Sequence, residues 1–323
     1  MSTEQRTTTA RQLYQKMESA RKPYTDRAEK CAQLTIPMAF PKESDSSSTK
    51  YDTPYQSIGA RGVNNLTSKL MLALFPPNAP FFRLSLGGDI KAQLANDPTT
   101  QQEWEAALSS IENQIMQYME SHQMRVTMNE AMTQLILAGN VLLFLPPKEG
   151  GMKLYRLNQY VIARDGIGNT IEIVTKESIA YGALPPEAQK CVDGDNIEAH
   201  KAIDVYTHTY LDGESYQSYQ EINGAIIGGS EQTYPKDASP WIPLRLRKMD
   251  GESYGRSFVD EYLGDLKTLE ALSKAVAEVA AIASNIVFLV NPNSMTRISE
   301  LQKANAGDFV RGRLEDIQAL QIN

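Results

Sequence analysis

Apolar residues recur every three or four positions through most of the first 140 residues, which is the spacing of amphipathic helices. Three stretches carry this spacing most clearly, namely residues 9–34, 58–75 and 98–121. A fourth helix is expected over 127–138, because it is followed by Gly139, a residue type that commonly ends helices. Pro23 lies inside the first stretch and predicts a break or kink there. The third stretch places Trp104 and Tyr118 on its apolar face, and we expect both in the core.

The period of the pattern changes to two between residues 141 and 249. Short runs in this region alternate apolar and polar residues or are rich in β-branched and aromatic residues, as strands are. Three turn-forming sequences separate them: DGIGN, LDGES and INGA. Short strands joined by such turns predict an antiparallel sheet. Together with the helical residues 1–140, the pattern predicts an α+β fold.

A proline-free stretch of about thirty residues, 258–288, predicts the longest helix of the chain. At 1.5 Å per residue it would extend roughly 45 Å. Its apolar residues, taken as one stripe, are Val259, Leu263, Leu266, Leu269, Leu272, Val276, Val279, Ile282 and Ile286. Its charged residues include five acids and two lysines. Spacings of three and four suit packing against neighbouring helices at a shallow angle, so we expect such neighbours. Residues 289–323 follow as a small mixed α/β piece.

Composition narrows the classes of function. The 323 residues contain 32 basic and 39 acidic side chains, a net charge of −7, whereas a DNA-reading protein normally carries a basic patch. The two cysteines, Cys31 and Cys191, lack the spacing of a zinc site or a disulfide framework. The sequence contains neither a phosphate-binding glycine loop nor a metal-binding motif, so we expect no cofactor. No secretion signal and no membrane span is visible, so we expect synthesis in a cytosol and no membrane insertion.

The stretch DGESYGRSFVDEY, Asp250 to Tyr262, allows two interpretations. In the first, carboxylates such as Glu252 and Glu261 serve a hydrolase as general acid and base. In the second, the stretch is the start of the long helix. Ser257 would then be its N-cap and Asp260, three residues later, would complete a capping-box-like pair. The second interpretation needs fewer assumptions, because no histidine lies nearby in sequence to activate a serine.

Nearly the whole chain resembles the portal (head–tail connector) proteins of short-tailed, autographivirus-type bacteriophages. No single motif carries the resemblance, which depends on a set of stretches: PYTDRAEKCAQLTIP, FPKESD, GARGVNNLTSKLMLALFP, LILAGNVLLFLP, MKLYRLNQYVIARDGIGN, YGALP, IDVYTHTYLD, DGESYGRSFVDEYLGDLKTLEAL and AGDFVRGRLEDIQALQ.

The resemblance implies the phage portal fold, with a wing over residues 1–257, a first stem helix over 258–288 and a clip over 289–323. It implies a dodecameric ring at one capsid vertex, around a tunnel through which double-stranded DNA passes without specific binding. The implied partners are capsid and scaffolding proteins, the terminase, and the tail adaptor and nozzle proteins. Portal proteins are virion components that assemble in the host cytoplasm and have no enzymatic activity, so the resemblance implies a conduit for genome packaging, retention and ejection.

The resemblance also suggests where contacts with DNA and partners would lie. The stem residues expected to face the tunnel are Asp265, Lys267, Glu270, Lys274 and Glu278. We expect this face to be mostly acidic, which would repel phosphates. The clip residues expected to contact the terminase or tail are Arg297, Lys303, Arg311 and Arg313.

The chain ends at LQIN, where portal proteins continue into a returning stem helix, a tunnel loop and a crown. We therefore expect a truncated or partly represented portal polypeptide. Two alternatives stay open at this point: a tail or adaptor protein of the same virion, and a carboxylate-based hydrolase.

Overall fold

The structure is a computed structural model, and it describes residues 8–46, 48–77, 79–90, 97–147, 150–192, 197–284, 287–290, 303 and 317–320. The chain divides into two compact units, residues 1–266 and 267–323, and each is described by itself. The described part of the chain combines helices with antiparallel sheets, so the predicted α+β class is confirmed. It contains no helix with both the length and the apolarity needed to cross a membrane.

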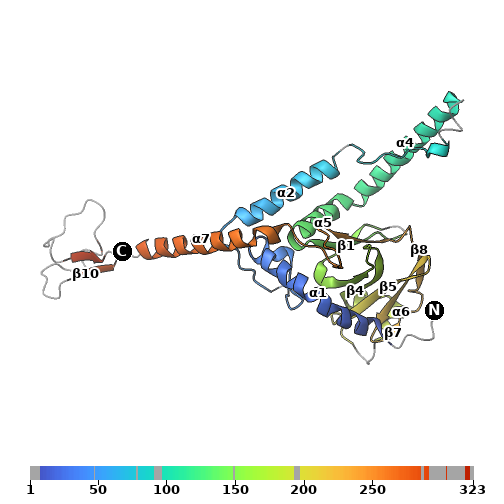
Figure 1. Cartoon of the computed structure of the whole chain (residues 1–323). Helices are drawn as coiled ribbons and strands as arrows, with labels where there is room; N and C mark the ends of the chain where they lie inside the picture. Colours follow the sequence, from blue (N-terminus) through green and yellow to red (C-terminus); the bar gives the residue numbers. More distant parts are fainter. Residues whose placement is uncertain are drawn as a thin grey trace. The chain divides into compact units, whose positions relative to one another are not determined.

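Long helices form the first part of the first unit (Figure 1). They are α1 (Ala10–Gln33), α2 (Ile58–Leu74), α4 (Pro98–Ser121) and α5 (Met124–Ala138). A capping box formed by Thr9 and Gln12 begins α1, and Gly139 ends α5 in the left-handed conformation with φ 74°. Helix α1 continues through Pro23 as one element, so the predicted break is not present.

The remainder of the first unit is built from two antiparallel sheets. The smaller has the order β2-β1-β9 and contains Lys153–Tyr155, Asn140–Phe144 and Trp241–Arg245. The larger has the order β3-β4-β5-β6-β7, with β8 also paired to β6. Its strands are Tyr160–Arg164, Thr170–Ala180, Ala202–Asp212, Ser215–Ile222, Ala225–Ile226 and Gln232–Pro235. Short elements connect some of these strands: η3 (Leu157–Gln159), η4 (Tyr181–Ala183) and α6 (Pro186–Gln189). Another short element, η2 (Pro37–Ala39), lies between α1 and α2.

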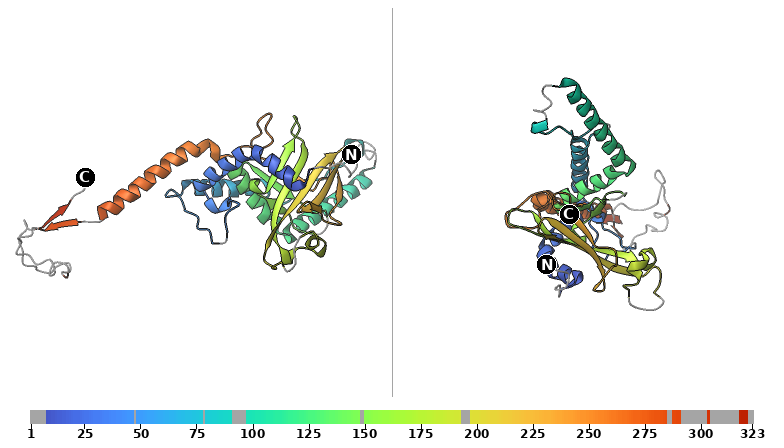
Figure 2. Two further views of the ribbon diagram at one scale, coloured as in Figure 1. Left: turned by 90° about the horizontal axis from the view of Figure 1, so that it is seen from below. Right: turned by 90° about the vertical axis from the view of Figure 1, so that its right-hand side faces the viewer.

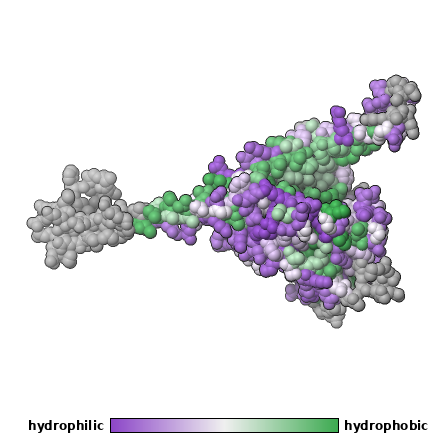
Figure 3. Space-filling view, viewed as in Figure 1, coloured by the Kyte–Doolittle hydropathy of each residue, from purple (hydrophilic) through white to green (hydrophobic). Residues whose placement is uncertain are grey.

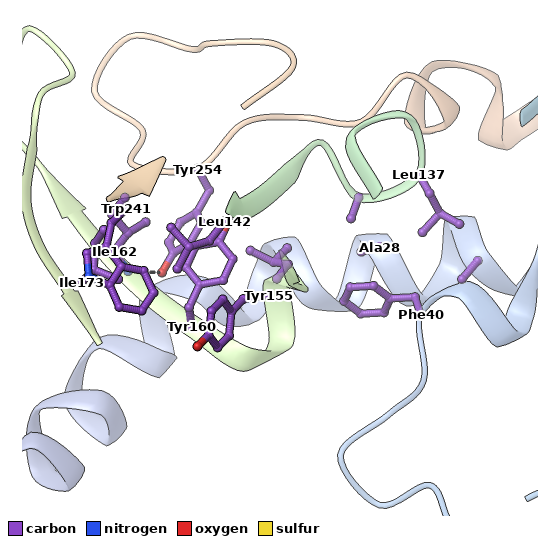
Figure 4. Close-up of a cluster of buried hydrophobic side chains, with 13 residues drawn as sticks. Ala28, Phe40, Leu137, Leu142, Tyr155, Tyr160, Ile162, Ile173, Trp241 and Tyr254 are labelled. Atoms are coloured by element: carbon purple, nitrogen blue, oxygen red, sulfur yellow. Dashed lines mark hydrogen bonds between the residues drawn. The ribbon is translucent and has the colours of Figure 1, made fainter. Parts of the chain in front are cut away.

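An aromatic core joins the helices to the sheets of the first unit. Figure 4 shows Tyr155, Tyr160, Trp241 and Tyr254 gathered near Leu142 of β1. Tyr155 and Trp241 lie with ring centroids 5.7 Å apart, and both side chains are buried. Aromatic side chains remove a large apolar area from water, so this cluster contributes strongly to the stability of the unit.

The start of the long helix belongs to the first unit. A short 3₁₀ turn, η5 (Val259–Tyr262), leads into α7 (Leu263–Ser284). Val259 and Leu266 are buried against Cys31 of α1, Val63 of α2 and Ile136 of α5.

The second unit contains the rest of α7 and a two-stranded antiparallel sheet. Its strands are β10 (Val287–Val290) and β11 (Ile317–Leu320). The pattern had extended the helix to residue 288, but Val287 and Phe288 pair with Leu320 and Ala319 in the sheet. Their β-branched and aromatic side chains suit a strand as well as a helix, so the apolar pattern alone does not distinguish the two.

Candidate functional site

The stretch before α7 is fixed by backbone contacts that only glycine permits. A Cβ atom at Gly139 would lie 2.3 Å from the carbonyl carbon of Arg256, and one at Gly255 would lie 2.7 Å from the Cβ atom of Arg245. This close approach lets the Phe258 N–H donate to the carbonyl of Ile136 at 3.1 Å. The end of α5 therefore determines where the long helix begins.

The Ser257 hydroxyl accepts a hydrogen bond at this start, although the N-cap residue of η5 is Phe258, one position after the predicted Ser257. The donor to Ser257 Oγ is the backbone N–H of Asp260, at 2.9 Å, and the serine side chain is buried beside Cys31. The Asp260 carboxylate has no bond to the Ser257 N–H among the described hydrogen bonds, so the pair forms half of a capping box. Ser257 and Asp260 thus both lie at the helix start, where the Ser257 side chain contacts the backbone, and not the carboxylate, of Asp260.

Two of the four carboxylates of the same stretch are paired with arginines. Glu252 accepts from Arg256 at 2.7 Å, and Glu261 forms an ion pair with Arg247. Hydrogen bonds from Arg256 and Tyr24 hold the pKa of Glu252 below its ordinary value. A general acid needs a raised pKa to keep its proton near neutral pH, so this geometry does not favour the hydrolase interpretation.

The part of α7 in the second unit has an exposed apolar face. Leu272, Val276, Val279 and Ile282 are between 52% and 69% exposed. Successive residues of an α-helix are turned by about 100°, so Leu272, Val276 and Val279 lie within about 60° of one another. Large apolar side chains gathered on one helix face usually pack against a partner.

The predicted single stripe is in fact two faces. A step of three residues along an α-helix falls about 60° short of a full turn, so each step rotates the side-chain direction around the helix axis by that amount. The chain takes three such steps, from Leu263 through Leu266 and Leu269 to Leu272. Leu263 and Leu272 therefore point to opposite sides of the helix by spacing. This agrees with burial, because Leu266 is 9% exposed and Leu272 is 60% exposed.

The charged residues of this segment lie opposite its apolar face. By the same spacing, Lys267, Glu270, Lys274 and Glu278 fall on the side away from Leu272. Lys274 and Glu278 form an ion pair at 3.9 Å. The charges of the two lysines and two glutamates cancel, so these four residues form a neutral side. We had expected a mostly acidic one. Asp265, seven residues before Leu272, shares the direction of Leu272 and is separate from the other four candidates.

Helix α4 carries a second exposed apolar face, in the first unit. Trp104, Ile111, Ile115 and Tyr118 lie within about 60° of one another by helical spacing, and their exposed fractions are 37–48%. The prediction that Trp104 and Tyr118 belong to the core is therefore wrong. Figure 3 shows hydrophobic residues continuing over the region of α2 and α4, where Leu72 is 64% exposed. The periodic pattern identified this face correctly but did not show whether the same chain covers it.

The clip candidates are largely beyond what the structure describes. Lys303 is exposed in a turn, whereas Arg297, Arg311 and Arg313 lie outside the described residues. Within the described residues, no group of three or more His, Cys, Asp or Glu side chains is placed to hold a metal ion.

The sequence of the chain matches a known protein family. Residues 7–323 match the family model described as bacteriophage head to tail connecting protein. The chain is 50% identical over 321 residues to the portal protein of Escherichia phage T7 and 49% identical over 320 residues to that of Enterobacteria phage T3. It is also 29% identical over 320 residues to the portal protein of Enterobacteria phage SP6. These matches cover 96–97% of the chain but 60% of each relative, so the chain spans under two thirds of the relatives' length.

Proposed function

The chain belongs to the family of bacteriophage head-to-tail connecting proteins, and from this premise we propose that it acts as a portal subunit. Copies of the chain assemble side by side into a ring, and the ring forms the conduit for DNA at one capsid vertex. In this proposal the role is structural and involves no bond-making chemistry, and the match to the connecting-protein family supports it. The tail-adaptor and hydrolase alternatives are not favoured.

The exposed apolar face of α7 is the observation that carries this proposal. Leu272, Val276 and Val279 are each at least 60% exposed, although burying such a side chain contributes about 1.5–3 kcal/mol. A copy of the same helix offers the same spacing of small and large apolar residues, so identical helices can pack at a shallow angle. A contact of this face with a different face of the neighbouring helix is heterologous, and its repetition around an axis closes a ring when the rotation between copies is a whole fraction of a full turn. We propose that this ring is a dodecamer, as the resemblance to portal proteins implies.

The charged side of α7 suits a surface that DNA passes. Lys267 and Lys274 attract phosphates, while Glu270 and Glu278 repel them at the next turn. Balanced charges release few counterions on contact with DNA and therefore bind it weakly. We propose that Lys267, Glu270, Lys274 and Glu278 face the tunnel and allow DNA to move without being held.

The remaining assignments follow the portal architecture. Residues 1–257, which make up most of the first unit, would serve as the wing. Residues 258–288, which include α7, would serve as the first stem helix, and residues 289–323 as the clip. Lys303 and the clip arginines Arg297, Arg311 and Arg313 would contact the terminase during packaging and the tail adaptor and nozzle proteins afterwards. Capsid and scaffolding proteins would hold the ring at the vertex, after assembly in the host cytoplasm.

The substitution Val276→Asp tests the proposal, with Lys274→Gln as its control. Each substitution lowers the net charge by one unit, and the two positions are two residues apart in the sequence. Only Val276 belongs to the apolar face. Native mass spectrometry and negative-stain electron microscopy should show rings for the unchanged protein and for Lys274→Gln. Val276→Asp should shift the protein to monomers while its circular dichroism spectrum is kept. Rings that persist in Val276→Asp, or monomers in the unchanged protein under all conditions, would contradict the proposal.

A further inference from the structure

A cationic cavity lies between two loops of the first unit. One loop joins β3 to β4 and contains Asp165, and the other follows β9 and contains Lys248 and Glu252. Both loops project on the same side of the sheets in the left view of Figure 2. The cavity has a volume of about 190 Å³, and three of its lining side chains are cations: Arg164, Arg245 and Lys248. A volume of this size holds one small polar group with one or more waters.

Within the described residues, none of these three cations is paired with a carboxylate. Arg164 donates to the backbone carbonyls of Ser253, Gly168 and Pro243 at 3.0–3.1 Å. Arg245 donates to the carbonyl of Glu252 at 2.7 Å, and Lys248 donates to the carbonyl of Ile167 at 3.1 Å. Carbonyl dipoles solvate these cations but do not neutralise their charge.

The two carboxylates that line the cavity are engaged elsewhere. Asp165 accepts from the backbone N–H groups of Ile167, Gly168 and Asn169 at 2.6–3.0 Å, closing its own turn. Glu252 is paired with Arg256 at 2.7 Å. The cavity therefore combines three positive charges that, among the described residues, contact backbone carbonyls and no carboxylate, in a protein whose net charge is −7.

The two arginines also repel each other. Burial and the neighbouring charge of Arg245 lower the pKa of Arg164 below its ordinary value. An anion placed between the two guanidinium groups would remove this repulsion. Guanidinium forks bind planar and tetrahedral oxyanions through paired N–H groups, and each arginine keeps N–H groups that no carbonyl occupies.

We propose that Arg164, Arg245 and Lys248 form a receptor for one oxyanion group, a carboxylate or a phosphate. Two sources supply this chemistry: a free small anion, and an acidic side chain of a second copy of this chain. The second source rests on the proposed self-assembly, and the first does not. Duplex DNA is a poorer fit, because its phosphates are part of a wide, stiff backbone, whereas the cavity is a narrow space between two loops.

Thermal unfolding in phosphate tests the receptor. Inorganic phosphate is titrated against sodium chloride at matched ionic strength, for the unchanged protein, Lys248→Gln, Arg245→Gln and the control Lys236→Gln. Lys236 is an exposed lysine of the same unit that lies outside the cavity. We expect phosphate at ten times its dissociation constant to raise the melting temperature of the unchanged protein and the control by about 3 °C. The rise should be at least halved in Lys248→Gln, an exposed position whose replacement leaves the core intact.

Sedimentation velocity on the same proteins distinguishes the two sources. If the occupant is a side chain of a second copy, phosphate weakens self-association more than chloride does, and Lys248→Gln weakens it without phosphate. If the occupant is a free anion, phosphate raises the melting temperature and self-association is unchanged. Equal responses of Lys248→Gln, Arg245→Gln and Lys236→Gln in both measurements would overturn the receptor. A response to a DNA duplex but not to phosphate would overturn it as well. Neither result depends on whether Val276→Asp breaks the ring.

Discussion

The carboxamide of Asn140 holds the backbone of Gly255 through both of its polar groups. Asn140 Oδ1 accepts from the Gly255 N–H at 2.6 Å, and Asn140 Nδ2 donates to the Gly255 carbonyl at 2.7 Å. Asn140 is the first residue of β1 and is 2% exposed, so both bonds are shielded from water. This contact, between residues 115 positions apart, anchors the start of α7 to the core of the first unit.

Asn140→Ala removes both bonds, together with a third from Asn140 Nδ2 to the Ala138 carbonyl at 3.1 Å, and leaves the buried N–H and carbonyl of Gly255 without these partners. Each unsatisfied buried group costs about 1–3 kcal/mol, so the loss of partners for the two Gly255 groups should lower the free energy of unfolding by about 2–6 kcal/mol. Urea denaturation of the first unit, followed by circular dichroism, measures the change. As a control, Asn169→Ala alters an exposed asparagine in the β3–β4 turn and should cost less than the core replacement. Equal losses in the two variants would show that the Asn140 contact contributes little.

Ser257→Ala and Asp260→Ala should differ in effect. The serine hydroxyl caps the Asp260 N–H, so its loss should cost about 0.5–2 kcal/mol. Asp260→Ala keeps that backbone bond and removes only the favourable interaction of a carboxylate with the helix start, about 0.3–1 kcal/mol. Urea denaturation resolves the two, and the aspartate effect should shrink in high salt. A larger loss for Asp260→Ala would mean that its side chain completes the capping box in solution.

The sequence predicted the types of the elements well, because helical and strand periods differ clearly. It placed α4 and α5 close to their observed positions, and it predicted the antiparallel connections from turns such as the one at Gly213, which has φ 61°. It did not show that Trp104 is exposed, because periodicity identifies an apolar face and not the partner that covers it.

Contacts between distant parts of the chain were also beyond the sequence. Arg164 and Arg245 are 81 positions apart and meet only because β9 lies beside β1 and the β3–β4 turn approaches the loop after β9. The glycine at 255 and the asparagine at 140 each suit many local structures. Their pairing depends on the position of α5, which long-range packing determines.

Alkaline pH should destabilise the first unit through Tyr254. Its ring is buried, its hydroxyl accepts from the Ile162 N–H at 3.1 Å, and burial raises its pKa to about 12. The unfolded chain loses this proton near pH 10, before the folded chain does. The contribution of Tyr254 to the free energy of unfolding should therefore be constant below pH 10 and fall between pH 10 and 12, by up to about 1.4 kcal/mol per pH unit.

Urea denaturation at pH 8 to 11 of Tyr254→Phe and Tyr262→Phe measures this contribution. Tyr254→Phe removes the ionisable group and should flatten the decline above pH 10, although Tyr14, Tyr155 and Tyr160, whose pKa values burial also raises, keep part of it. Tyr262 is 47% exposed, and its replacement should leave the slope as in the unchanged protein. Identical slopes for both variants would exclude Tyr254 as a source of the decline.

The apolar face of α4 provides the last prediction, since an exposed stripe in the first unit suggests a second contact between copies. Trp104→Ser combined with Ile111→Ser should reduce self-association, because two large apolar side chains no longer leave water when copies meet. Asn113→Ser, on the opposite side of the helix by spacing, is the matched control and should associate normally. Because about half of each side chain is already exposed, the free energy of unfolding should fall by only about 1 kcal/mol per substitution. A large loss of stability with unchanged association would instead show that this face packs within its own chain.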